Sequence, residues 1–311
     1  MAVYSLSDNF KSFFTRLNPS PTFEAQAASE YSSIKTLIED PHGLAAELAP
    51  ACFLQGSYRQ QTAIYTINDV DIVALCGLSY PGPIGGQSYG RDRIFSIVAA
   101  PLVGDARYRG KVYYRASSMC IKIDLGIKVE ILPVVYKAGQ NDFAKEPFIL
   151  YRPEKGTWED GYARYHQQLL SWKNAPGQTN GIFIPAVKVF KHLRSRFKLD
   201  AVSFHLECLL FSFPNVLFQG GPADYIAAIL SHIAGTAADV WYRYRCDTPC
   251  KERDVFTAQE WDLPSWKSFH AAVVVWSRAA AIARQAGDRA VAIRAWQSLL
   301  GDDFFPASVS P

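Results

Sequence analysis

Two aspartates, Asp69 and Asp71, stand two positions apart at the start of the apolar run DVDIVALC. On a β-strand, residues i and i+2 point to the same face, so we expect these carboxylates to lie side by side. Like charges that close repel one another unless a cation or a shared proton relieves them, and hard oxygen ligands suit Mg²⁺. The alternative is an edge strand whose polar face meets water, but the run continues apolar on both faces. The pair therefore predicts a magnesium site.

A metal ion held by this pair needs a further carboxylate, preferably from a neighbouring strand. Glu130, which stands mid-strand among the apolar residues of IKVEILPVV, is the predicted third ligand. Asp124 is its competitor, but it precedes a Leu-Gly pair, where aspartate is common in ordinary turns. The predicted catalytic and metal-binding set is therefore Asp69, Asp71 and Glu130.

A Gly-Ser pair, Gly56 and Ser57, precedes the aspartates, with residues 58–68 between them. Glycine lets a backbone approach a phosphate closely, and a serine hydroxyl with exposed backbone N–H groups can hold phosphate oxygens. Each piece alone is common in proteins. In combination they predict a nucleoside triphosphate site, in which two Mg²⁺ ions activate an attacking hydroxyl and stabilise the departing pyrophosphate, with Mn²⁺ as a substitute.

The composition is that of a soluble globular protein. Of the 311 residues, 49% are hydrophobic and 20% are charged, enough for one large domain or two smaller lobes. A net charge of +3 excludes a strongly basic nucleic-acid coat, although a local basic groove is compatible with it. The cluster WYRYRC has a composition also found in RNA grooves, but one short cluster does not predict RNA binding. We therefore predict no stable nucleic-acid partner.

Several sequence features bear on the cellular location. The first twenty residues lack a signal-peptide core and cleavage site, and no run of about 18 apolar residues occurs, so we expect a cytoplasmic protein without a membrane partner. Most of the six cysteines lie in apolar runs and are predicted to be reduced core residues. Cys246 and Cys250 could form half of a metal site, but no second Cys/His pair stands at the spacing of a zinc finger.

The elements that position the candidate residues differ between the two halves of the chain. Residues 5–48 are mostly helical in pattern, ACFLQGS is a strand that enters a turn, and DVDIVALCGL is a buried strand. Residues 77–90 are rich in glycine and proline and predict a mobile loop, after which a helix extends to about Val103. The segment up to residue 136 predicts strands, with DLG as a hairpin turn.

After Pro153 the strand-like alternation disappears and helical periodicity continues to the end. The sequence therefore predicts an α+β fold. Residues 1–152 would form N-terminal helices and the catalytic core with a mixed sheet, and residues 153–311 a helical lobe that closes the nucleotide cleft.

The segments GSYRQQTAIYTINDVDIVAL and KVEILPVV resemble the nucleotidyltransferase core of the bacterial cyclic-oligonucleotide synthases. These enzymes are relatives of cyclic GMP-AMP synthase and oligoadenylate synthetase in the DNA polymerase beta-like superfamily. The family pattern is Gly-Ser-Tyr, Thr-x-Ile, Asp-Val-Asp-x-Val and then Val-Asp-Val-Val-Pro. Glu130 stands where the family most often has aspartate; glutamate keeps the charge but adds one methylene.

The resemblance implies three further nucleotide-binding residues. Lys191 in AVKVFKHLRSRF would contact the donor triphosphate, Ser203 in VSFHLECLLF would contact a phosphate, and Phe204 would stack on a base. Each has a plainer interpretation as well. The face of the helix that carries Lys191 could simply be solvated, Ser203 could be only a helix N-cap, and Phe204 could belong to the core.

The resemblance implies a bacterial, metal-dependent enzyme that condenses ribonucleoside triphosphates into a cyclic di- or trinucleotide and releases pyrophosphate. ATP is one expected substrate, and the second base is open. In antiphage (CBASS) signalling, such a product activates a separate effector protein. Two alternatives stay open: transfer of a nucleotide to another acceptor, such as an RNA end, a protein or a small molecule, and a non-catalytic nucleotide-binding module.

Overall fold

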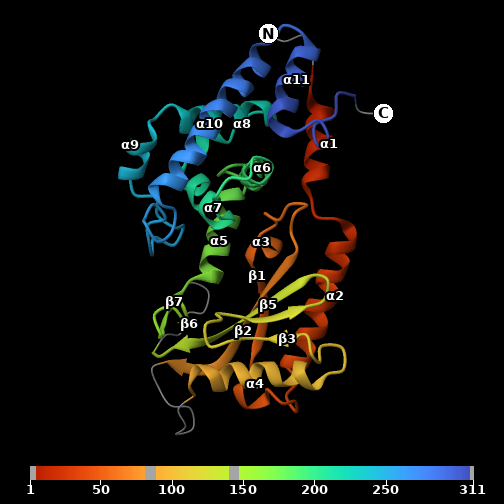
Figure 1. The fold of residues 1–311 in the computed structure, drawn as a ribbon, viewed down its shortest axis with the longest axis vertical. Coiled ribbons are helices and arrows are strands. Elements are labelled where there is room, and N and C mark those ends of the chain that lie inside the picture. Colours follow the sequence, from red (N-terminus) through yellow and green to blue (C-terminus); the bar gives the residue numbers. More distant parts are fainter. Residues whose placement is uncertain (1–4, 81–88, 140–146, 309–311) are drawn as a thin grey trace. The chain divides into compact units, whose positions relative to one another are not determined.

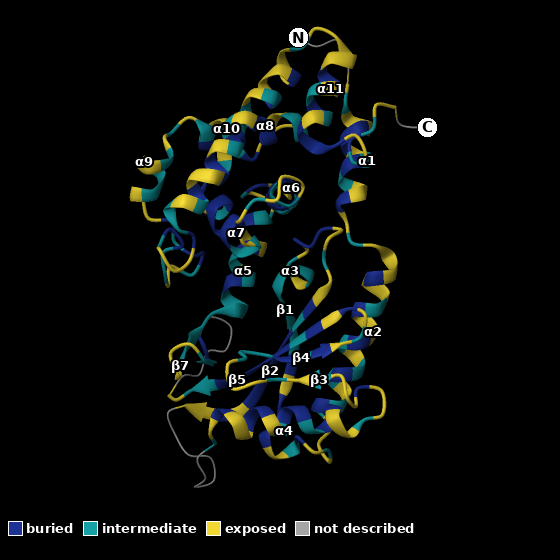
Figure 2. Ribbon diagram, viewed as in Figure 1, coloured by how far each residue is buried: buried dark blue, intermediate teal, exposed yellow. Residues whose placement is uncertain are grey.

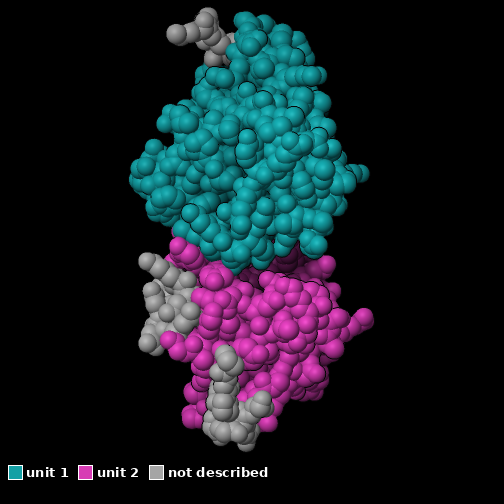
Figure 3. Space-filling view, turned by 90° about the vertical axis from the view of Figure 1, so that its left-hand side faces the viewer, with its two compact units in different colours: residues 1–19, 62–65, 169–311 teal, residues 20–61, 66–168 magenta. Residues whose placement is uncertain are grey.

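The computed structural model of the protein describes residues 5–80, 89–139 and 147–308. The chain divides into two compact units (Figure 3). The helical unit comprises residues 1–19, 62–65 and 169–311, and the sheet unit comprises residues 20–61 and 66–168. The short segment 62–65, which lies between the Gly-Ser pair and the two aspartates, thus belongs to the helical unit although both its neighbours belong to the sheet unit.

A mixed sheet forms the centre of the sheet unit (Figure 1). Its described strands are β1 (Ala51–Gln55), β2 (Asp69–Tyr80), β3 (Val112–Tyr113), β4 (Ile121–Asp124), β5 (Lys128–Lys137), β6 (Phe148–Arg152) and β7 (Thr157–Gly161). Five of them follow the order β1-β2-β5-β4-β3, and β6 pairs with β5 and β7. β2 and β5 are parallel, whereas the other pairs seen in the described residues are antiparallel.

Alternation along β2 sends its side chains into two different cores. Val70 and Ile72 belong to the larger core, to which α2 (Pro21–Ile38) and α4 (Arg91–Gly104) contribute their buried faces. Val73 faces the other side, where it packs with residues of β5 and β6 in a smaller cluster. Figure 2 shows the central strands largely buried. The two aspartates share the parity of Val73 and therefore lie on the face with the smaller cluster.

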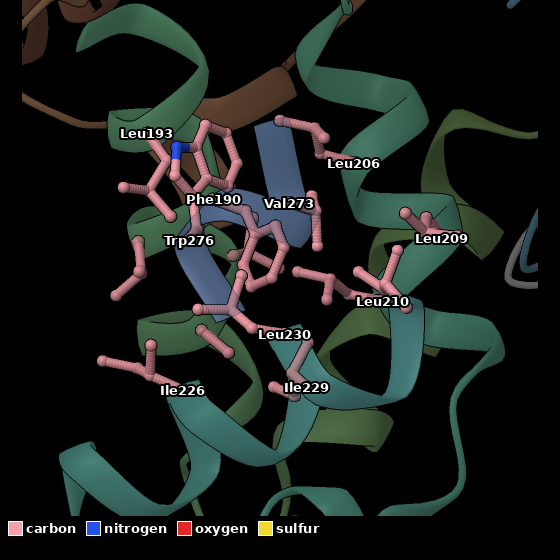
Figure 4. Packing of buried hydrophobic residues seen from close by; sticks show 14 of the residues in the cluster. Phe190, Leu193, Leu206, Leu209, Leu210, Ile226, Ile229, Leu230, Val273 and Trp276 are labelled. Atoms are coloured by element: carbon pink, nitrogen blue, oxygen red, sulfur yellow. The ribbon is translucent and has the colours of Figure 1, made fainter. Parts of the chain in front are cut away.

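Helices dominate the helical unit. They are α1 (Ser7–Leu17), α6 (Phe183–Arg196), α7 (Ser203–Ser212), α8 (Pro222–Ala234), α9 (Ala238–Arg243), α10 (Leu263–Gln285) and α11 (Arg289–Leu300). Apolar side chains of α6, α7, α8 and α10, among them Phe190, Leu206, Ile229 and Val273, point toward one another in a common core (Figure 4). α5 (Ala163–Asn174) begins in the sheet unit and ends in the helical unit.

Shorter helical pieces complete the fold. They are α3 (Gly56–Arg59), which directly follows β1, and two 3₁₀ turns at Ala46–Leu48 and Asn215–Leu217. Within the described ranges, no helix is both long enough and apolar enough to cross a bilayer.

Most predicted elements are confirmed: the early helices, the strands at ACFLQ and from Asp69, and the hairpin between β4 and β5. Two predictions were wrong. β7 lies beyond Pro153, where we expected no further strand. Its short polar sequence TWEDG has no apolar alternation from which a strand could be predicted, and in the described residues it pairs with β6. β2 extends to Tyr80, so the loop predicted from residue 77 begins later, after a register shift between Cys76 and Ser79. The rest of that loop, residues 81–88, lies outside the described residues.

The predicted boundary between residues 152 and 153 stays a prediction about domains. The two compact units do not follow this boundary, since α1 belongs to the helical unit and α5 is shared between the units.

Candidate active site

Parallel pairing of β2 with β5 places the three predicted acids on two neighbouring strands. Asp71 is the direct register partner of Glu130, and Asp69 pairs with Lys128. Asp69 is exposed, while Asp71 and Glu130 are partly buried. Asp71 and Glu130, which lie 59 positions apart in the sequence numbering, are thus neighbours on adjacent strands, as the sequence predicted.

The electrostatics of Asp71 reflect this crowding of like charges. Burial, and after it the negative charges of Asp69 and Glu130, raises the pKa of the Asp71 carboxyl from 3.8 to about 7. A carboxyl in such surroundings favours its neutral form until a cation compensates the charge. The protein therefore holds a carboxylate cluster that gains from binding a positive ion.

Glu130 has a partner that the sequence analysis missed. Lys122 on β4 is its cross-strand neighbour and donates a hydrogen bond from Nζ to Glu130 Oε1 at 2.6 Å. Both side chains are partly exposed, at 42% for Lys122 and 29% for Glu130, so the pair contributes little to stability. The sequence did contain a signal, because Lys122 and Glu130 are both polar residues inside the two strands of the predicted hairpin.

Gly56 is fixed by its contact with Asp71. Its φ is +69°, a conformation that favours glycine, and a Cβ built on it would lie 1.9 Å from Asp71 Oδ2. Gln55, the preceding residue, is the register partner of Asp71 in the antiparallel β1–β2 pair. The glycine predicted for a phosphate turn is thus required by the packing of a candidate metal ligand. Ser57 follows it in α3 and is partly exposed.

The chemistry of these donors fits Mg²⁺, although their present arrangement is not that of a formed metal centre. Over residues 5–80, 89–139 and 147–308, no group of three or more His, Cys, Asp or Glu side chains is placed to hold a metal ion. That statement includes Cys246 and Cys250. The acids still offer the oxygen ligands that Mg²⁺ prefers, and the raised pKa of Asp71, caused by burial and by its acidic neighbours, marks repulsion that a cation would relieve.

Lys191 lies in a buried polar network inside the helical unit. Its Nζ donates to Glu207 Oε1 at 2.7 Å and to the Thr62 hydroxyl at 2.9 Å, and that hydroxyl donates to Glu207 Oε1 at 2.8 Å. The exposed fractions are 2% for Lys191, 4% for Glu207 and 0% for Thr62. The interpretation of Lys191 as part of a solvated face is therefore wrong. Its contact with the donor triphosphate stays a prediction.

The network anchors the segment 62–65, which the sequence analysis did not foresee. Besides Thr62, Tyr65 donates its backbone N–H to Leu17 O at 2.9 Å, and its ring lies 4.5 Å from that of Phe304 between centroids. One signal was present in the sequence: Glu207 is the only acidic residue in the otherwise apolar run HLECLLF. A charge in such a run calls for a buried partner.

Ser203 and Phe204 open α7, and both are partly exposed. The N-cap residue is Val202, and no side chain caps the helix, so the interpretation of Ser203 as an N-cap is wrong. Phe204 packs at the border of the helical core, and the guanidinium carbon of Arg253 lies 5.2 Å from its ring centroid. Their roles in phosphate and base binding stay predictions.

Comparisons with known proteins show the family of the chain. Residues 4–174 match the family model of the Second Messenger Oligonucleotide or Dinucleotide Synthetase domain. A relative named cyclic UMP-AMP synthase, from Rhodothermus marinus (strain SG0.5JP17-172), is 24% identical over 220 residues, which cover 63% of this chain and 74% of the relative. The predicted resemblance and the predicted enzyme class, a nucleotidyltransferase, are confirmed at the level of the family.

Solved structures show the same fold. The structure of CdnC of E. coli MS115-1 with ATP is similar at a TM-score of 0.70 and 16% identity, over 96% of this chain and 98% of that chain. The CdnE c-UMP-AMP synthase of Rhodothermus marinus, solved with Apcpp and Upnpp, has a TM-score of 0.65 at 19% identity, over 88% and 96% of the two chains. The predicted α+β fold, with a polymerase beta-like lobe and a helical C-terminal region, is confirmed.

Proposed function

Because the chain belongs to the Second Messenger Oligonucleotide or Dinucleotide Synthetase family, we propose that it condenses ribonucleoside triphosphates into a cyclic di- or trinucleotide and releases pyrophosphate. The observation that carries the proposal is the pairing of Asp71 with Glu130 across parallel strands, with Asp69 two positions earlier. Gly56 packs against the same Asp71 carboxylate. Three acids beside a Gly-Ser turn are what metal-assisted nucleotidyl transfer needs.

Asp69, Asp71 and Glu130 would hold Mg²⁺, or Mn²⁺ in its place. The bound metal supplies Lewis-acid stabilisation of the charge that develops during transfer. Asp71 must lose its proton to act as a ligand, because its pKa is raised to about 7 by burial and by the two neighbouring acids. Glu130 shares its carboxylate with Lys122, which bonds to Oε1, so a metal ion would compete with that ion pair or use Oε2.

Four further residues are proposed to contact the donor nucleotide. Ser57 offers a partly exposed hydroxyl at the start of α3, and Ser203 offers one at the start of α7. Phe204 would provide an apolar face for a base. Lys191 is buried and already donates to Glu207 and Thr62, so its proposed phosphate contact competes with its buried ion pair.

We place the product in bacterial antiphage (CBASS) signalling, in which it activates a separate effector. ATP is the substrate we propose first. UTP is the first candidate for the second one, since the relative from Rhodothermus marinus is named a cyclic UMP-AMP synthase. The other bases are tested in the same experiment.

The test is an incubation of the protein with Mg²⁺ and all four ribonucleoside triphosphates, followed by mass spectrometry. We expect a cyclic product that resists phosphatase, formed without any added acceptor, and no product from the Asp69→Asn/Asp71→Asn variant. A linear product, or turnover only with an added acceptor, would contradict cyclisation. Full activity of the double variant would contradict the assignment of the acids.

A further inference from the structure

A groove of about 470 Å³ runs along the outer edge of β1 in the sheet unit. Its lining comes from α2, β1, α3 and α5 and consists of Tyr31, Phe53, Leu54, Arg59, Arg164, Gln167 and Gln168. None of the three acids of the candidate active site belongs to this lining. The volume lies in the range of about 300 to 1,000 Å³ that small-molecule sites occupy.

The groove carries positive charge that the described residues do not compensate. Its lining includes two arginines and, among the residues that the structure describes, no acidic side chain. Neither Arg59 nor Arg164 forms an ion pair with a described carboxylate; Arg59 is exposed, and Arg164 is partly buried. Guanidinium groups present a planar fork of donors that matches phosphate oxygens. An anion is therefore the expected partner, and phosphate is the one that best suits this geometry.

The rest of the lining suits a planar ring with polar edges. The guanidinium carbon of Arg164 lies 4.2 Å from the ring centroid of Phe53, so the planar guanidinium is held against an aromatic ring on one wall. Tyr31 is held in place, because its hydroxyl donates to Cys52 O at 3.2 Å. Gln167 and Gln168 add amide groups, which both donate and accept hydrogen bonds and can pair with the edge of a base.

We propose that this groove is a second nucleotide-binding site, which binds the phosphate of a nucleotide through Arg59 and Arg164 and its base beside Phe53 and the two glutamines. The inference goes beyond the proposed function and does not depend on it, since it uses none of the catalytic candidates. Arg59 ends the short helix α3, which begins with Gly56 and Ser57. A nucleotide in the groove therefore stabilises the turn that we assign to the donor phosphate.

The test is calorimetric titration of the full chain with AMP in the presence of EDTA. We expect saturable binding that Arg59→Ala and Arg164→Ala each weaken at least tenfold. Arg294→Ala, which removes an exposed arginine of α11, is the matched control and should leave the affinity unchanged. Arg59 is exposed, so its variant keeps the fold even if Arg164→Ala does not; thermal melting checks both.

Further arms separate this site from its alternatives. Ser57→Ala should weaken AMP binding far less than Arg59→Ala does; a loss as large as that of Arg59→Ala would assign AMP to the donor turn and overturn the proposal. Inorganic phosphate that bound as tightly as AMP would reduce the groove to a simple anion site and overturn it too. An AMP affinity that neither arginine substitution changes would also overturn the proposal. Cyclic di-AMP is titrated in parallel. Tighter binding of AMP would identify a free nucleotide as the natural occupant, and tighter binding of cyclic di-AMP would identify a reaction product.

Discussion

Substitution of Lys191 by methionine tests whether this lysine holds the fold or binds substrate. The lysine and Glu207 form an ion pair at 2.7 Å with side-chain exposures of 3% and 5%, so neither charge is solvated. Removing one partner of such a pair takes away the counter-ion of a buried charge and costs about 3 to 5 kcal/mol. Folded proteins are stable by only about 5 to 15 kcal/mol, so Lys191→Met is expected to lose a large part of the total.

Urea unfolding, followed by tryptophan fluorescence and circular dichroism, measures this loss. The double variant Lys191→Met/Glu207→Met removes both charges, and we expect it to lose less stability than Lys191→Met alone. Thr62 then keeps a buried hydroxyl without these partners, which costs about 1 to 3 kcal/mol, so the double variant does not fully regain the wild-type value. Lys188→Met, on the same helix, is the control; its Nζ donates to Asn18 Oδ1 near the surface, and we expect a loss below about 1 kcal/mol.

The alternative is that Lys191 leaves its ion pair to bind the donor triphosphate. In that case Lys191→Met weakens nucleotide affinity more than it weakens the fold. A loss of stability below about 1 kcal/mol, together with a weaker affinity for ATP, would refute the structural role of the lysine.

Three further predictions concern the carboxylate cluster. Gly56→Ala should abolish most activity in a pyrophosphate-release assay, because the new Cβ would displace Asp71. The control Gly126→Ala has a similar backbone strain, at φ +88°, but nothing lies within 4 Å of its Cβ, so it should keep activity. Equal effects of the two variants would contradict the role of the Gly56–Asp71 contact. The metal-free protein should lose stability as the pH rises from about 4 to 7, by at most about 1.4 kcal/mol per pH unit. Burial and acidic neighbours raise the pKa of Asp71 to about 7, so in this range the folded state holds a proton that the unfolded state releases. Denaturant titrations at several pH values measure this, and an unchanged slope in Asp71→Asn would disprove the cause. Mg²⁺ at about 100 times its Kd should stabilise the protein by about 2.7 kcal/mol in thermal melts, and Asp69→Asn/Asp71→Asn should remove that gain; a gain that survives would place the ion elsewhere.

The sequence predicted the placement of the three acids well, because its signals are local. Asp69 and Asp71 are two positions apart on one strand, so their common face follows from the period of a strand alone. Glu130 could be added because a charged residue inside an apolar strand requires a reason. Its pairing with Asp71 needed only the assumption that the two strands are neighbours, which the parallel β2–β5 register confirms.

The helical side was harder to predict, because its contacts join distant parts of the chain. Thr62 meets a lysine 129 positions later and a glutamate 145 positions later. The periodicity of a helix shows which residues share a face, but it does not show what covers that face. The sequence was therefore compatible with a solvated face at Lys191, a residue that is buried in the structure. β7 was missed for a related reason: a short edge strand with polar residues has no period to detect.

Glu130 is the one glutamate among the three candidate acids, and Glu130→Asp tests what its longer side chain contributes. The longer side chain reaches Lys122, to which it is bound at 2.6 Å, while its backbone is already paired with that of Asp71. Aspartate is one methylene shorter, so we expect it to weaken the contact with Lys122 but to keep the charge that a metal ligand needs. Glu130→Asp should therefore retain magnesium-dependent pyrophosphate release, and Glu130→Gln should lose it at least a hundredfold, since the amide is neutral. If the aspartate variant were as inactive as the glutamine variant, charge at position 130 would not be enough, and the length of the glutamate side chain would be what the reaction requires.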